Sequence, residues 1–177
     1  MSSLDWTDAI TRLIALNTFT SVWYWLAVVV TWAVASNWLI GVPFDVLLRA
    51  RKCAPQPLAD LEGLVDINVR RIVATNATFG LALTGLIGFA LTVLGVLSFF
   101  YRLELAQGIF ILAAPLTLVV IINMRLAHQL HDAPLHGADL VRRLFVVRVW
   151  TQVVAMISLF FTAMYGMYMA ISASVFF

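Results

Sequence analysis

The sequence predicts an all-α fold: an integral membrane bundle of four transmembrane helices, with an N-terminal interfacial helix and two helical extensions into the cytoplasm. Of the 177 residues, 63% are apolar and only 11% are charged, and the mean hydropathy is +0.98. An ordinary soluble domain has about 45–50% apolar and about 25% charged residues. A chain this short cannot hide so many apolar groups in one core, so lipid is the expected solvent.

Four stretches without Asp, Glu, Lys or Arg are long enough to cross a bilayer, which takes about 20 apolar residues in a helix. We expect one transmembrane domain over residues 1–177, with spans at 21–44, 72–101, 105–124 and 149–177. Within the first span, Ala33–Ser36 is typical of a signal-peptide cleavage site. The apolar run continues well beyond it, so we expect this segment to be retained as a span.

The segment before the first span has its own helical pattern. Trp6, Ile10, Leu13 and Ile14 recur at helical spacing, while the charged residues fall elsewhere around the helix. We therefore predict an interfacial helix over residues 1–18, along the outer membrane surface. An ordinary helix packed on the bundle is the alternative.

The basic residues predict the orientation. The connectors 45–71 and 125–148 hold nine of the eleven Lys and Arg, and short loops rich in Lys and Arg stay on the cytoplasmic side. We therefore expect both connectors to be cytoplasmic and both termini to face the periplasm or the exterior.

Each cytoplasmic connector contains a proline break followed by a helical pattern. Pro55 and Pro57 end any helix that leaves the first span, and Pro134 does the same in the second connector. Apolar residues then recur with a period near 3.6: Leu58, Leu61, Val65 and Val69 in the first connector, and Leu140, Val141, Leu144 and Phe145 in the second. The second and fourth spans are therefore expected to begin as helical extensions within these connectors.

Small residues predict where the spans pack. Helices in lipid associate through close packing, because lipid removes the hydrophobic drive between them. One face of the second span carries small residues at a spacing of three and four: Gly85, Gly88, Thr92 and Gly95. The expected partner is a small-residue face of the first span: Ala27, Thr31 and Ala35. An intermolecular contact is the alternative.

Polar side chains inside the spans are neutral. Four amides lie toward the inner ends of the spans: Asn37, Asn76, Asn123 and Gln152. We expect them to form hydrogen bonds between helices, each contributing about 0.6–2 kcal/mol. An amide-lined pore entrance or a small polar ligand site is the alternative. No ionisable group of the kind that pumps and proton-coupled carriers use lies within a predicted span.

The three histidines are close together in the second connector. His128 and His131 are three residues apart, near enough on a helix to contact one metal ion. Imidazole suits zinc, copper, nickel or iron. A solvated polar loop explains the spacing equally well, so a metal site at these two residues is a hypothesis with a simpler alternative.

No pattern indicates an enzyme or a bound cofactor. The sequence has no nucleophile with its base, no phosphate-binding glycine loop and no paired carboxylates. A net charge of +2 is too small to indicate nucleic-acid binding. The single cysteine, Cys53, excludes an internal disulfide and a multi-cysteine metal site. The expected partners are the lipid bilayer and either other membrane protein subunits or further copies of this chain.

The stretch from Trp23 to Lys52 includes WAVASNWLIGVPFDVLLRARK and is followed by ADLEGLVDINVRRI. It resembles a group of small proteobacterial four-helix inner-membrane proteins, some of which are labelled components of the Suf (SufBCD) iron–sulfur assembly complex. The resemblance covers about the first hundred residues and implies a bacterial inner-membrane setting. It carries over no functional residue, since this chain has a single cysteine and no ATP-binding loop.

The function that these patterns favour is non-catalytic. We expect an accessory or structural subunit of a larger membrane complex, because the loops are short and the apolar faces are extensive. The alternative is a small homo-oligomeric channel or transporter whose pore is lined by the amides. A metal-binding or redox membrane protein that uses His128 and His131 is the third candidate.

Overall fold

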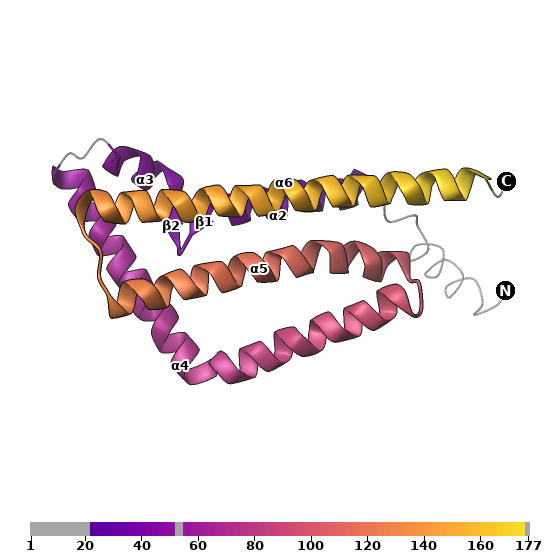
Figure 1. Ribbon diagram of the computed structural model, residues 1–177, viewed down its shortest axis with the longest axis horizontal. Helices are drawn as coiled ribbons and strands as arrows, with labels where there is room; N and C mark the ends of the chain where they lie inside the picture. Colours follow the sequence, from indigo (N-terminus) through magenta and orange to yellow (C-terminus); the bar gives the residue numbers. More distant parts are fainter. Residues whose placement is uncertain (1–21, 52–54, 176–177) are drawn as a thin grey trace, which may run out of the picture.

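The computed structural model describes residues 22–51 and 55–175, which are almost entirely helical (Figure 1). The elements are α2 (Val22–Asn37), β1 (Trp38–Leu39), β2 (Val42–Pro43), α3 (Phe44–Ala50), α4 (Pro55–Phe99), α5 (Glu104–Asp132) and α6 (Gly137–Val175). The predicted helical class is confirmed. The interfacial helix predicted over residues 1–18 lies outside the described residues.

Three helices of the described chain are long and apolar enough to cross a membrane: 56–99 of α4, the whole of α5 and 137–169 of α6. By length and composition these are the helices of a membrane protein. α4 ends two residues before the predicted limit of the second span, and α5 continues past the third span to Asp132. α2 is also apolar but shorter.

The first predicted span, 21–44, is wrong as a single helix. α2 ends at Asn37, and the chain turns back through β1 and β2, which pair antiparallel. Ile40 and Gly41 form the turn with φ angles of +50° and +72°. Positive φ at both central residues is what the favoured two-residue hairpin turn requires. Pro43 also disfavours helical geometry at the residue before it, so the helix cannot continue through this stretch.

α4 and α6 both begin within the predicted connectors and continue without interruption into apolar sequence. α4 starts at Pro55, where a missing backbone N–H costs nothing because the first turn has no partner for it. α6 starts at Gly137, which has a φ of +62°. The predicted apolar faces of both helices point into the interior, since Leu61 of α4 and Leu144 of α6 are fully buried.

The main hydrophobic core lies at one end of the molecule, on the left in Figure 1, where the hairpin, α3 and parts of α4, α5 and α6 meet. Its buried members are Ile40, Val42, Leu47, Ala50, Leu61, Val65, Val69, Leu126, Ala127, Leu130, Leu140, Val141, Leu144 and Val147. These residues come from the connectors and the adjoining turns. The connectors therefore form a packed unit of their own.

A smaller core holds α2 against α5 and α6. Val28 and Trp32 of α2 are buried with Val119 and Ala155. The hydroxyl of Tyr24 also donates a hydrogen bond of 3.1 Å to the Gly108 carbonyl on α5. α2 is thus fixed along the side of the bundle that α5 and α6 form.

α4 changes direction part-way along its length (Figure 1). Its first half belongs to the main core, and its end packs on α5 through the rings of Phe99 and Phe110, whose centroids are 5.5 Å apart. Between these two contacts, no residue in the most apolar 18-residue stretch of α4 is buried. In the corresponding stretches of α5 and α6, 22% and 33% of the residues are buried. The second half of α4 is the least packed helical segment of the three.

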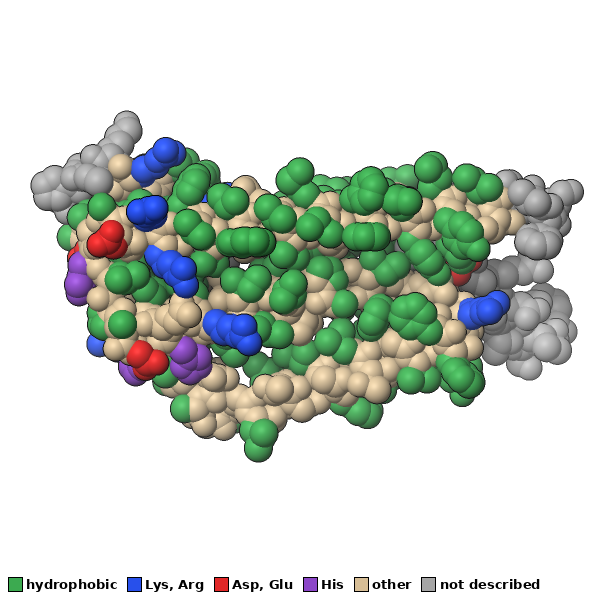
Figure 2. Space-filling view, in the orientation of Figure 1, with side chains coloured by type: hydrophobic (Ala, Val, Ile, Leu, Met, Phe, Trp, Pro, Cys, Tyr) green, Lys and Arg blue, Asp and Glu red, His purple; other side chains and the backbone are tan. Residues whose placement is uncertain are grey.

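The charged side chains are concentrated at the end that holds the main core (Figure 2). Asp45 pairs with Arg49 at 2.7 Å and Asp66 with Arg70 at 2.9 Å, both on exposed helix surface. Such exposed pairs contribute only a few tenths of a kcal/mol. Hydrophobic side chains cover the middle of the molecule in the same view, so the structure divides into a charged end and an apolar body.

Candidate functional site

One hydrogen bond joins a predicted intramembrane amide, Asn76, to a candidate metal-binding histidine, His128. The side-chain nitrogen of Asn76 on α4 lies 2.9 Å from Nε2 of His128 on α5, and the pair is partly buried. With the amide nitrogen as donor, His128 accepts at Nε2, which puts its own proton on Nδ1. Asn76 therefore makes an interhelical hydrogen bond, as predicted for the amides.

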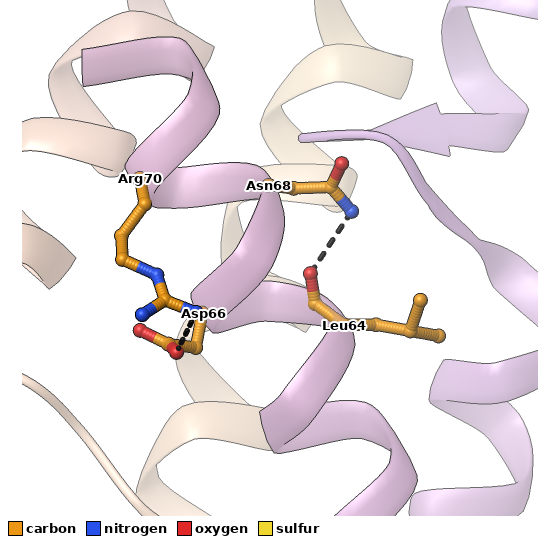
Figure 3. A network of polar contacts seen from close by, with 4 residues as sticks. All are labelled: Leu64, Asp66, Asn68 and Arg70. Carbon is orange, nitrogen blue, oxygen red and sulfur yellow. Dashed lines mark hydrogen bonds and ion pairs between the residues drawn. The ribbon is translucent and has the colours of Figure 1, made fainter. Parts of the chain in front are cut away.

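The β1–β2 turn packs on α4 at Asn68, which precedes Asn76 on the same helix. A Cβ added to Gly41 would lie 3.0 Å from Oδ1 of Asn68, so the backbone of the turn approaches this amide closely. Asn68 donates a hydrogen bond of 2.9 Å to the Leu64 carbonyl. Figure 3 shows its amide directed away from the Asp66–Arg70 pair, on the other side of the helix. The Asn68 side chain thus packs against the hairpin turn at Gly41.

An open groove of about 390 Å³ lies between the hairpin turn, α4 and α5. Its polar lining consists of the side chains of Asn68, Arg71, Thr75 and Asn76, and its apolar lining includes Leu83 and Met124. Amides, a hydroxyl and a guanidinium offer hydrogen bonds but no nucleophile or carboxylate. These side chains can form hydrogen bonds to a polar group that enters the groove.

The other three amides do not join this groove. Asn123 donates a hydrogen bond of 3.1 Å to the Val119 carbonyl of its own helix, and its Oδ1 is buried without a hydrogen-bond partner. Asn37 at the end of α2 and Gln152 on α6 are exposed. The predicted interhelical hydrogen bond is therefore found for Asn76, while Asn123 bonds within α5.

Two of the three histidines, His131 and His136, line the same pocket beside Glu62, and His128 is not among the residues that line it. His128 contacts Asn76, His131 is exposed, and His136 lies 3.8 Å from the carboxylate of Glu62. The same carboxylate accepts a hydrogen bond of 2.7 Å from the Gly137 amide at the start of α6. No group of three or more His, Cys, Asp or Glu that could hold a metal ion is found in residues 22–51 and 55–175. Glu62 instead connects α4 to the loop before α6.

The small-residue face of α4 is not packed against α2. Gly85 and Gly88 have no atom within 4 Å of an added Cβ, and Thr92 is exposed. Gly95 alone approaches another helix, with Phe110 of α5 at 3.6 Å. Ala27, Thr31 and Ala35 are on α2, which packs against α5 and α6. The expected pairing of the first and second spans within one chain is therefore wrong, because the bend takes α4 away from α2.

The sequence reasoning missed one buried polar contact at the α4–α5 turn. Nε2 of Gln107 donates a hydrogen bond of 2.9 Å to the Ser98 carbonyl, which lies in the last turn of α4. Carbonyls in the last turn of a helix have no intrahelical partner. The signal in the sequence was a glutamine near the start of a predicted span.

Comparison with known proteins adds no family. No protein-family model matches the chain, and neither the curated proteins nor the solved structures contain a match. Function is therefore inferred from the geometry of the chain itself.

Proposed function

We propose that the chain is a non-catalytic, multi-pass inner-membrane protein that acts as an accessory subunit of a larger membrane complex. In this proposal the second half of α4 binds a transmembrane helix of a neighbouring subunit. The observation that supports it is the open face at Gly85 and Gly88, on a helix whose most apolar window is not buried at all.

The physical reason lies in how helices associate in lipid. Contacts between transmembrane helices depend on backbones that approach closely, and small residues at intervals of three and four permit this. Lipid chains fill the space beside a glycine face less closely than a fitted helix does. A face of this kind that no other described segment of the chain covers is therefore suited to a partner from outside the chain.

The same proposal includes four crossings and an orientation. α2 is taken to complete the first crossing together with the hairpin, and the charged end is taken to be cytoplasmic, so that both termini face the periplasm. The concentration of arginine around the main core supports this orientation, because basic residues in short segments are retained in the cytoplasm. α4 and α6 then extend from the membrane as the two cytoplasmic extensions.

The test is native electrophoresis of the full chain after gentle detergent extraction from its own membranes, with mass spectrometry of the band. We expect the wild-type chain to migrate with one reproducible set of foreign subunits. The double substitution Gly85→Leu/Gly88→Leu should release the chain from that assembly, because two leucines fill the space that the partner backbone would occupy.

Ala90→Leu is the matched control. Ala90 is exposed and lies two residues from Gly88, about 200° around the helix, so it adds a leucine to the same segment on another face. An assembly that survives the glycine substitutions, or one that Ala90→Leu disrupts equally, would contradict the proposal. A wild-type monomer would also contradict it. An assembly that contains only this chain would replace it with the homo-oligomeric channel, to be tested by ion conductance in liposomes.

A further inference from the structure

A second groove lies on the charged end of the molecule, between α3 and the first turns of α6. It has a volume of about 430 Å³, which is within the range of about 300–1,000 Å³ of small-molecule sites. Its walls are mainly apolar and include Phe44, Leu48, Phe145 and Val146. The last three are 38–42% exposed, so the groove opens an apolar surface to its surroundings.

Two arginines line this apolar groove. Arg51 follows α3 and Arg142 is on α6, so the two guanidinium groups come from different elements. The guanidinium of Arg51 lies 5.4 Å from the centre of the Phe145 ring. Among the residues that the structure describes, no Asp or Glu lines the groove. The groove therefore combines an apolar surface with two guanidinium groups.

A third arginine lies behind the wall. Arg148 is only 8% exposed, and its guanidinium lies 3.4 Å from the centre of the Phe44 ring. It forms no ion pair with any carboxylate of the described chain. A buried cation without a counter-ion is costly, and a cation–π contact offsets only part of that cost. An anion in the groove would reduce the remainder.

We propose that this groove binds an anionic phospholipid of the inner leaflet, with its phosphate at Arg51 and Arg142 and an acyl chain along Phe44, Leu48 and Phe145. Arginine suits a phosphate because its planar fork can donate two hydrogen bonds at once. Basic pockets between transmembrane helices on the cytoplasmic side bind lipid head groups in this way. The inference rests on the cytoplasmic placement of this end, but not on the assembly through α4.

The groove has features that favour a lipid over a soluble anion. Its lining includes Phe145 and Val146, which come just before the uncharged stretch of α6 that begins at Val149, so it lies near the depth at which a phospholipid carries both its phosphate and the start of its chains. A free phosphate would use the arginines and leave the exposed apolar walls in water, at a cost that grows with apolar area.

The experiment uses the full chain, delipidated in detergent micelles and titrated with phosphatidylglycerol or phosphatidylcholine, with bound lipid counted by native mass spectrometry. We expect phosphatidylglycerol to bind about tenfold or more tightly than phosphatidylcholine. Arg51→Gln/Arg142→Gln should remove this preference. Arg142→Gln alone should weaken it by about fivefold. Both side chains are exposed, so these substitutions leave the packed core intact.

The matched control is Arg49→Gln/Arg143→Gln, which removes the same charge from α3 and α6 outside the groove, and which should keep the preference. Leu48→Asn retains every arginine and should weaken phosphatidylglycerol binding through the acyl chain alone. Equal binding of the two lipids, an equal loss in the control, or full competition by inorganic phosphate would each overturn the proposal. None of these readouts depends on a partner subunit, so they are independent of the electrophoresis result for Gly85 and Gly88.

Discussion

Asn76 of α4 and His128 of α5 are joined side chain to side chain, with 2.9 Å between the amide nitrogen and Nε2. The contact lies beside the open groove, between the packed first half of α4 and the exposed second half. Asn76 comes three residues after Val73, which is the furthest residue along α4 that packs against the main core.

We expect Asn76→Leu and His128→Leu to be coupled in their effect on the free energy of unfolding. Hydrogen bonds between membrane helices contribute about 0.6–2 kcal/mol, and either substitution alone removes this one. The double variant should therefore lose less than the sum of the two single variants. Unfolding of the four proteins in mixed micelles by a denaturing detergent, followed by circular dichroism, measures the coupling.

Asn123→Leu is the control for that cycle. The Asn123 nitrogen bonds only within α5, and its Oδ1 is buried without a partner. Replacing a buried unsatisfied amide by an apolar group is close to neutral or stabilising. Strictly additive losses for Asn76 and His128 would show that the contact does not contribute to stability.

Gly41→Ala should destabilise the protein by about 1–2 kcal/mol, the usual cost of left-handed backbone at a residue with a Cβ. The close approach of Asn68 at 3.0 Å adds to this cost, so the further substitution Asn68→Ala should recover part of the loss. The midpoint of unfolding in the same micelles gives the values.

Gly63→Ala provides the comparison on α4. An added Cβ at Gly63 meets nothing within 4 Å, and replacing a glycine inside a helix by alanine stabilises it by about 0.5–1 kcal/mol. The opposite signs at Gly41 and Gly63 are the expected result. A Gly41→Ala protein as stable as the wild type would mean that the turn does not hold this backbone geometry.

The orientation can be tested with single cysteines placed in a Cys53→Ser background. Leu103 lies in the turn between α4 and α5, and Asp139 lies at the start of α6, at the charged end. With both connectors cytoplasmic, a membrane-impermeant thiol reagent should label Leu103→Cys in intact spheroplasts. Asp139→Cys should react only after permeabilisation. Labelling in the reverse order would invert the proposed topology.

The sequence predicted the parts of the fold that depend on local pattern. Leu61, Val65 and Val69 recur with helical period and are buried together, because an amphipathic helix packs its apolar face against neighbouring elements. The hairpin was missed because a hydropathy window counts apolar residues, and Trp38–Pro43 is as apolar as its surroundings. The backbone signal was Gly41 followed closely by Pro43.

Pairing between distant elements could not be predicted in the same way. The spacing of Gly85 and Gly88 indicates a surface that another helix can approach, but the choice of that helix depends on the bend in α4. Likewise, Asn76 and His128 were noted separately, because 52 residues separate them and only the crossing of α4 and α5 brings them together.

The placement of the main core at one end has a mechanical consequence for α4. Its first half is held by Leu61, Val65 and Val69, whereas its second half contributes no residue to either core. The end of α4 is held on α5 through the Phe99–Phe110 ring contact and the Gln107–Ser98 hydrogen bond, so a neighbouring helix that packs on the stretch between the bend and this contact would leave the interior at the charged end unchanged.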